Sequence, residues 1–210
     1  MLLGPPASGK GTQADMLKSR FDLPSASPGS MLREEKRAGS ALGLEADRLT
    51  SEGRLVSDAV INAVVRSWLD RHSGDGFVFD GYPRTLGQAA ALDEMLSSRG
   101  TPLEVALLLD ADLPTLRARV AKRMVCLACG NTTSLDLLPA GDGKCPRCAG
   151  ELSRRADDNA ETLDVRFREY LEKTAPVAGY YDKRHLLHHV KAARSQDEVF
   201  AEVLGILNLK

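Results

Sequence analysis

Short apolar runs alternate with amphipathic stretches along the chain, and the two kinds of segment predict different elements. Apolar runs bounded by glycine, proline or a carboxylate are typical of buried parallel strands, which we expect at residues 1–3, 76–80, 105–110 and 185–190. Apolar residues that recur every three or four positions predict helices over 10–21, 85–96, 112–120, 159–173 and 195–207. Pro176 predicts a break before a further helical stretch at 178–183. This alternation predicts an α/β fold, with helices on both faces of a parallel sheet.

Between the first two apolar runs the pattern is helical. Ser27 followed by Pro28 is typical of a helix start, because proline suits the first helical position. A second short helix is predicted over 41–52, and Ser57–Asp58 begins a longer one. Residues 27–56 therefore form a predicted helical insertion in the α/β fold.

A loop rich in glycine and proline follows the first apolar run. Residues 4–12 read Gly-Pro-Pro-Ala-Ser-Gly-Lys-Gly-Thr, which fits the G-x-x-x-x-G-K pattern of loops that wrap nucleotide phosphates with backbone N–H groups. Lys10 and the N-terminus of the next helix would then face the phosphates. Gly11 stands where Ser or Thr usually follows the lysine, and Thr12 comes one place later. The alternative is a surface turn without a ligand.

Composition and charge narrow the class of protein. The 210 residues include 28 Lys and Arg against 29 Asp and Glu, giving a net charge of −1. Bulk binding to nucleic acid or acidic membranes needs a positive surplus, so neither partner is expected. The longest apolar run, 105–109, is far shorter than the ~20 residues of a membrane span. The N-terminus lacks the pattern of a secretory signal, and we expect a cytoplasmic protein.

The four cysteines form two C-x-x-C pairs, Cys126 with Cys129 and Cys145 with Cys148. A disulfide-stapled protein would spread its cysteines more widely. Two pairs at this spacing predict a tetrathiolate zinc site, in which two tight turns each present two sulfurs. Four free thiols, or a redox pair, are the alternatives.

Arginine exceeds lysine about two to one, and several arginines flank loops that should face the predicted phosphate site. They are Arg33, Arg84, Arg119, Arg123, Arg155 and Arg166. Phosphoryl transfer depends mainly on charge stabilisation, and guanidinium groups match phosphate oxygens. Taken singly, each is more typical of a solvated surface charge. Asp80, at the end of a predicted strand, could hold a water of Mg²⁺ or cap the next turn.

Three motifs and the cysteine insert together resemble the adenylate kinase family. They are Gly4-Pro5-Pro6-Ala7-Ser8-Gly9-Lys10-Gly11-Thr12-Gln13, Asp80-Gly81-Tyr82-Pro83-Arg84-Thr85 with Gln88, and Arg155-Ala156-Asp157-Asp158. The insert resembles the zinc-bearing long lid of bacterial members, and the similarity covers nearly the whole chain. The resemblance implies a P-loop NTPase-type fold and the reaction MgATP + AMP ⇌ 2 ADP. It implies a core of 1–26, 57–122 and 157–210, an AMP-binding insertion of 27–56 and a lid of 123–156.

The resemblance also implies a role for each matching residue. ATP would meet Ala7, Ser8, Gly9, Lys10, Gly11, Thr12, Arg119, Arg123, Thr132, Thr133 and Ala193. AMP would meet Pro28, Arg33, Arg54, Leu55, Val56, Gly81, Tyr82, Pro83, Arg84, Gln88, Arg155 and Arg166, with Gln88 at the adenine edge. The catalytic charges would be Lys10, Arg84, Arg119, Arg123, Arg155 and Arg166. Asp80 would lie near the Mg²⁺ that arrives with ATP, and the four cysteines would hold a structural zinc.

Three positions depart from the family pattern. Ala7 stands where glycine is usual, and Pro28 and Ser30 stand where threonine and aspartate are usual. A UMP/CMP-type kinase is one alternative, but those relatives have a short lid without cysteines, so AMP is favoured. A nucleotide-switched binding protein with a zinc ribbon for nucleic acid is another. Against it, only Lys144 and Arg147 are basic between the first and last cysteines. We expect a monomer whose partners are ATP, AMP and ADP.

Overall fold

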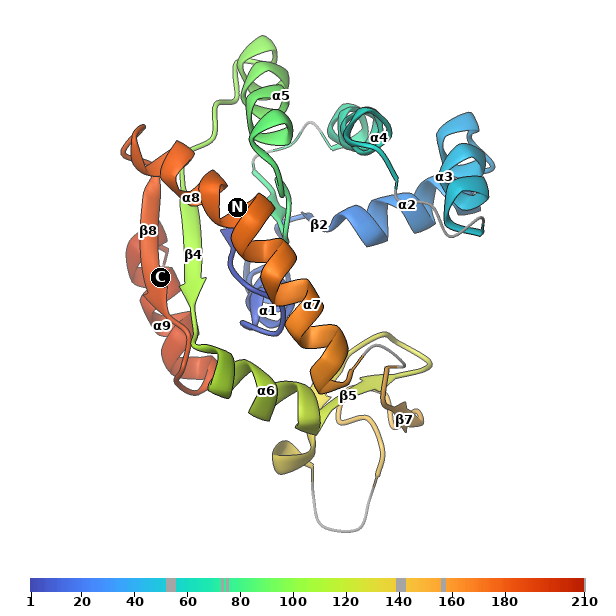
Figure 1. Ribbon diagram of the computed structural model, residues 1–210, viewed down its shortest axis with the longest axis vertical. Helices are drawn as coiled ribbons and strands as arrows, with labels where there is room; N and C mark the ends of the chain where they lie inside the picture. The colour runs from blue at the N-terminus through green and yellow to red at the C-terminus, as the bar shows by residue number, and fades with distance from the viewer. Residues whose placement is uncertain (52–55, 73, 75, 139–142, 156–157, 210) are drawn as a thin grey trace.

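A computed structural model describes residues 1–51, 56–72, 74, 76–138, 143–155 and 158–209 (Figure 1). Its parallel strands are β1 (Leu2–Leu3), β2 (Ser25–Ala26), β3 (Val78–Phe79), β4 (Ala106–Asp110) and β8 (Leu187–Lys191). β2 pairs with β3, and β4 pairs with both β1 and β8. A bridge from Leu2 to Asp80 connects β1 with the end of β3, which gives the order β2-β3-β1-β4-β8. The predicted parallel sheet is confirmed.

Helices cover both faces of this sheet. They are α1 (Lys10–Phe21), α4 (Asp58–Arg71), α5 (Leu86–Ser98), α8 (Ala175–Asp182) and α9 (Gln196–Leu207). Successive residues of a strand point to opposite faces, so Leu2 and Leu107 pack with α1 and α9. Their neighbours Leu3 and Leu108 pack with α4, α5 and α8. Each buried leucine contributes about 1.5–3 kcal/mol, which makes these two apolar layers the main support of the sheet.

Most helices begin where their capping residues predict. The side chains of Ser57, Thr85, Asp112, Asn159 and Ser195 each accept a hydrogen bond from the N–H three residues later. These bonds satisfy N–H groups that have no partner within the helix. Asp112 and Asn159 begin two helices that have not been named above, α6 (Leu113–Lys122) and α7 (Ala160–Glu169). The predicted starts are therefore confirmed by the caps themselves.

The predicted break at Pro176 is wrong. α7 passes into a π-helical turn (η2, Tyr170–Thr174) and then into α8, so the chain stays helical. Pro176 is the second residue of α8, directly after the π-helical turn, and this wider turn accommodates a residue that has no N–H to donate to the turn before it. The last strand also begins two residues later than predicted. His185 has φ 58° in the turn after α8, outside the extended conformation of a strand.

The predicted helical insertion contains α2 (Pro28–Arg37) and α3 (Ala41–Ser51), which Figure 1 shows extending away from the sheet beside α4. Glu35 of α2 is only 3% exposed. Its carboxylate accepts hydrogen bonds from Ser40 Oγ (2.5 Å), Ser67 Oγ (2.9 Å) and Arg71 Nη1 (2.7 Å). Ser40 precedes α3, and Ser67 and Arg71 belong to α4. One buried carboxylate therefore holds the three helices together.

A second, antiparallel sheet lies beyond α6, at the lower end of the view in Figure 1. Its strands are β5 (Arg123–Cys126), β6 (Thr132–Ser134) and β7 (Leu152–Ser153), in the order β6-β5-β7, with a 3₁₀ turn η1 (Leu135–Leu137). Among the described residues, no helix is both long and apolar enough to cross a membrane.

Replacing Glu35 with glutamine should lower the free energy of unfolding by about 1–3 kcal/mol, because the amide cannot satisfy all three donors. The hydrogen bond from Ser40 lowers the pKa of Glu35 against the effect of burial, and the bonds from Arg71 and Ser67 lower it further. A carboxyl whose pKa falls on folding contributes stability above its unfolded pKa. The difference in free energy of unfolding between the wild type and the variant should therefore narrow below about pH 4.

Urea denaturation at pH 7 and pH 3.5 measures this difference. Asp47→Asn is the matched control, because it breaks the exposed Lys36–Asp47 pair between α2 and α3, two of the three helices that Glu35 joins, and should cost at most about 1 kcal/mol. Equal effects of the two substitutions at pH 7 would contradict the role of Glu35.

Candidate functional site

The loop between β1 and α1 turns through backbone conformations that favour glycine. Gly4, Ala7 and Gly9 have φ values of 140°, 63° and 101°. A Cβ on Gly4 would lie 2.7 Å from the carbonyl oxygen of Leu109, so this position has no room for a side chain. Ala7 adopts the left-handed conformation, which costs a residue with a Cβ about 1–2 kcal/mol. Turns of this kind direct successive N–H groups into one concavity, which is the geometry of an anion site.

Lys10, the first residue of α1, bends back over this loop. Its Nζ donates to the carbonyl oxygens of Gly4 (2.9 Å) and Pro5 (2.7 Å) and lies 3.4 Å from Ser8 Oγ. Burial lowers the pKa of Lys10 to about 8, against the opposing effect of the Asp80 carboxylate. The charges of Arg84, Arg166 and Arg123 lower this pKa further, so they act on the same point.

Asp80 lies opposite Lys10, at the end of β3. A Cβ on Gly11 would lie 3.3 Å from Asp80 Oδ2, so the absence of a side chain at Gly11 leaves room for this carboxylate over the start of α1. Burial raises the pKa of Asp80, and the charges of Lys10 and Arg84 oppose that rise. The result is one carboxylate among several cations, beside an anion-binding loop. Mg²⁺ in nucleotide sites is held by one or two carboxylates plus phosphates and waters, so this donor set fits it.

Arg84 reaches the site from the loop after β3. Its Nε donates to the carbonyl oxygen of Gly81 (2.8 Å), across a cis peptide bond between Tyr82 and Pro83. Loss of hydration lowers the pKa of Arg84, and the neighbouring charge of Arg166 lowers it further. Cations that lie this close together favour the binding of an anion that carries several negative charges.

Arg119 and Arg123 come from the end of α6 and the start of β5. Arg119 donates to the carbonyl oxygens of Ser8 (3.1 Å) and Ala192. These bonds connect the loop between β1 and α1, which we call the phosphate-type loop, to the segment after β8. Arg123 forms a two-pronged ion pair with Asp158, whose side chain is 1% exposed. Both guanidinium groups are thus held by protein oxygens before any ligand arrives.

Gln88 lies near the start of α5 and is 5% exposed. Its Oε1 accepts the backbone N–H of Arg84 (2.7 Å), and its Nε2 donates to Asp58 Oδ1 (2.7 Å). Tyr82 is fully buried beside it, with its hydroxyl donating to Asn62 Oδ1 (2.8 Å). The amide is therefore firmly oriented.

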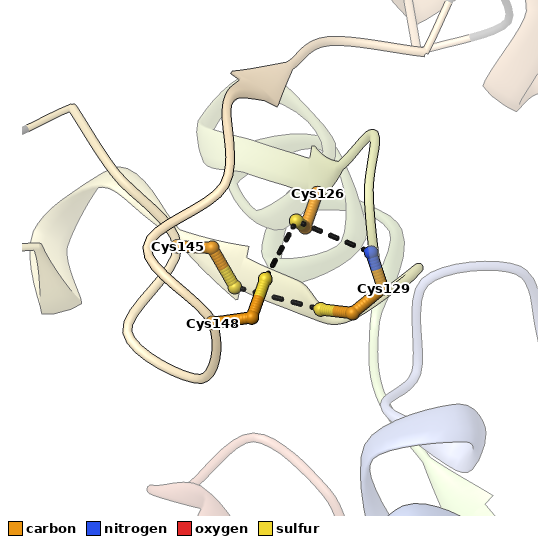
Figure 2. Close-up of side chains that lie close together, drawn as sticks. All are labelled: Cys126, Cys129, Cys145 and Cys148. Atoms are coloured by element: carbon orange, nitrogen blue, oxygen red, sulfur yellow. Dashed lines mark hydrogen bonds between the residues drawn. The ribbon is translucent and has the colours of Figure 1, made fainter.

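The four cysteines converge from two loops, as Figure 2 shows. Cys126 Sγ lies 3.5 Å from Cys148 Sγ, and Cys129 Sγ lies 3.7 Å from Cys145 Sγ. All four sulfurs lie within 4.8 Å of one another. Zn–S bonds of about 2.3 Å in a tetrahedron separate the sulfurs by about 3.8 Å, so the cluster fits a zinc ion. Burial opposes ionisation of Cys145, but N–H groups of Arg147 and Cys148 lower its pKa to about 6.

Comparison with known proteins identifies the family. A sequence model described as adenylate kinase matches residues 2–186. The adenylate kinase of Novosphingobium aromaticivorans is 40% identical over 210 residues, covering 99% of this chain and 97% of that protein. That of Thermodesulfovibrio yellowstonii is 39% identical over 212 residues, covering 100% and 99%. That of Syntrophomonas wolfei is 38% identical over 205 residues, covering 97% and 95%.

This chain belongs to the adenylate kinase family. The resemblance carried by the motifs is thereby confirmed. Adenylate kinases are nucleoside monophosphate kinases that transfer a phosphoryl group reversibly from MgATP to AMP and produce two ADP, and this is the activity of the chain. The α/β fold is that of the family, and the cysteine cluster fits the zinc-binding lid of its long-lid members.

The remaining predicted site residues of this adenylate kinase lie on several elements. Thr132 and Thr133 pair with β5 in the antiparallel sheet, and Ala193 borders an open hollow beside Asp110. Pro28 is buried at the start of α2, Arg33 is exposed on α2, and Val56 is half-buried against the core. Thr12 is half-buried on α1, Arg166 is half-buried on α7, and Arg155 is exposed before α7. The charge of Arg155 acts on Asp80. Arg54 and Leu55 lie outside the described residues.

Sequence reasoning missed two residues of this adenylate kinase site. Asp58 was assigned only to a helix start, yet it contacts Gln88 and Thr85. Asp158 was part of a motif without a role, yet it holds Arg123. These three contacts join residues that are 27, 30 and 35 positions apart, and a single sequence carries no signal for them.

Proposed function

We propose that phosphoryl transfer takes place between the phosphate-type loop and Arg84, at the carboxyl edge of the parallel sheet. The observation that carries this proposal is the convergence of charged side chains at the loop. Lys10 bends back over it, and a Cβ on Gly81 would lie 3.6 Å from Lys10 Cε and 3.7 Å from Arg84 Nη2, while one on Gly11 would lie 3.3 Å from Asp80 Oδ2. The charges of Asp80, Arg84, Arg123 and Arg166 accordingly all act on the Lys10 ammonium group. A transferring phosphoryl group spreads negative charge over three oxygens, and such a cluster stabilises it without covalent chemistry.

On the ATP side, the N–H groups of Ala7 to Thr12 would bind the phosphates, and Lys10 would exchange its carbonyl partners for phosphate oxygens. Arg119 and Arg123 would contact the same phosphates. Thr132 and Thr133, and the backbone of Ala193 beside the hollow at Asp110, would complete the ATP site. Mg²⁺ would neutralise phosphate charge while Asp80 holds its water shell.

On the AMP side, Arg33, Arg84, Arg155 and Arg166 would bind the phosphate, because guanidinium groups match its oxygens in pairs. Gln88 would contact the base. The other AMP contacts would come from Pro28, Arg54, Leu55, Val56, Gly81, Tyr82 and Pro83.

The core would comprise 1–26, 57–122 and 157–210, with 27–56 as the AMP-binding insertion and 123–156 as a lid that closes over ATP. Closure would exclude water, which could otherwise accept the phosphoryl group, and would complete the arginine set. The proposed site lies within one chain, so a monomer suffices. A cytoplasmic setting suits a cluster of reduced thiols.

Replacing Arg84 with methionine should lower kcat/KM for AMP about 10³-fold or more, because one charge that stabilises the transferring group is lost. ADP formation from MgATP with AMP, UMP or CMP measures this. Arg20→Met is the matched control, since Arg20 is exposed over the ring of Phe21, and it should change the rate less than about twofold. Wild-type turnover of AMP by the Arg84 variant would contradict the proposed site. Preference for UMP or CMP would favour the alternative kinase.

The cysteine cluster would hold one structural zinc per chain, with no part in the chemistry. Removal of the ion by a chelator should lower the melting temperature before it lowers the intrinsic rate, because the antiparallel sheet loses its cross-link. Metal analysis and calorimetry measure this. Cys145→Ser should bind little zinc and show no further change with chelator. Unchanged melting after complete metal removal would contradict a structural zinc.

A further inference from the structure

We propose that Asp58 is a positioning residue that fixes the orientation of the Gln88 amide, and so selects a monophosphate whose base carries an amino group rather than a carbonyl group. The observation is the pair of hydrogen bonds on the buried amide. Oε1 accepts from the Arg84 N–H and Nε2 donates to Asp58 Oδ1, both at 2.7 Å. The inference rests on the proposed contact between Gln88 and the base.

Thr85 fixes Asp58 in turn. Its Oγ1 accepts the N–H of Gln88 (3.1 Å), so its hydroxyl hydrogen is free to donate to Asp58 Oδ2 (2.7 Å). One carboxylate oxygen therefore faces the hydroxyl of Thr85 and the other faces the amide of Gln88. A carboxylate only accepts hydrogen bonds, and the backbone N–H of Arg84 only donates. The amide of Gln88 lies between the two and has one orientation that satisfies both.

In this orientation the amide has one N–H and one oxygen lone pair left for a ligand. Adenine presents an amino donor beside a ring-nitrogen acceptor, which matches an oxygen and an N–H side by side. Hypoxanthine, the base of inosine monophosphate (IMP), presents a carbonyl acceptor beside a ring N–H donor. It has the same shape with the opposite pattern, so it needs the amide turned by half a turn.

Turning the amide breaks both of its protein contacts. Oε1 would then face the carboxylate of Asp58, and Nε2 would face the N–H of Arg84. Gln88 is buried, so water cannot relieve these two mismatches. A site whose buried polar groups are left unpaired by the wrong ligand discriminates strongly. The selectivity against a carbonyl base therefore comes from Asp58, at the first turn of α4, together with the backbone N–H of Arg84, although the proposed contact with the base is made by Gln88. Of these two groups, only Asp58 is a side chain that a substitution can change.

The test is Asp58→Asn, measured as kcat/KM for AMP and for IMP with MgATP in the same preparation. An asparagine can accept from Thr85 through its oxygen and donate to Oε1 of Gln88, which removes one of the two mismatches of the turned amide and leaves the one with the Arg84 N–H. We expect kcat/KM for AMP to fall more than kcat/KM for IMP, so that the ratio of the two values falls on the order of 10- to 100-fold. The ratio does not depend on the fraction of folded enzyme, so partial unfolding cannot imitate this result.

Asp197→Asn is the matched control, because Asp197 also lies in the first turn of a helix, α9, and its loss should leave the ratio unchanged. Gln88→Ala separates this inference from the proposed function. If that variant leaves the ratio unchanged, Gln88 does not contact the base, and the base contact and the inference both fail.

Gln88→Ala can bring the ratio of kcat/KM for AMP to that for IMP close to one, while Asp58→Asn lowers both kcat/KM values by the same factor. In that case the base contact stands and the role of Asp58 is overturned. The inference is supported if Asp58→Asn changes the ratio in the wild-type background and has no effect on it in the Gln88→Ala background.

Discussion

Crowding of positive charge at one edge of the parallel sheet is the constraint on which the rest of the structure depends. Cations that repel one another do not stay together in a free protein unless oxygens hold them. Lys10 is held by carbonyl groups of its own loop, Arg84 by Gly81, and Arg119 by Ser8. Arg123 is held by Asp158. The site is thus pre-organised, and its protein oxygens occupy places that phosphate oxygens would take.

The fold supplies this arrangement because parallel strands bring their carboxyl ends to one edge. The loop after β1 and Asp80 after β3 meet there, since β1 and β3 are joined by the Leu2–Asp80 bridge. Two apolar layers on opposite faces support these strands. The helical insertion and the antiparallel sheet extend from the core, and each contains its own polar cluster: Glu35 with its three donors, and the four cysteines. In the proposed site, charge would bind phosphate, whereas a neutral amide oriented by Asp58 would identify the base.

Local signals predicted much of this structure. Capping residues such as Ser57 and Thr85 marked helix starts correctly, because the bond that they accept lies three residues away. The cysteines that contact one another lie 22 and 16 positions apart, so here the prediction came from a recurrent motif, two C-x-x-C pairs at the spacing of a tetrathiolate site, and not from a local contact. Pro176 misled, because its effect depends on the turn before it, which here is the wider π-helical turn. The bond from Arg119 to Ser8 and that from Gln88 to Asp58 join distant parts of the chain, and no local pattern encodes them.

The central claim is that the cationic cluster binds the phosphates of ATP, and the protonation of Lys10 tests it most directly. Burial lowers the pKa of this group to about 8, so deprotonated Lys10 is populated near that pH. Bound phosphate would raise that pKa, and binding should therefore take up protons at pH 8 and fewer at pH 6. Calorimetric titration with MgATP in two buffers of different ionisation enthalpy measures this uptake. Tight binding at pH 8 without proton uptake would contradict the account.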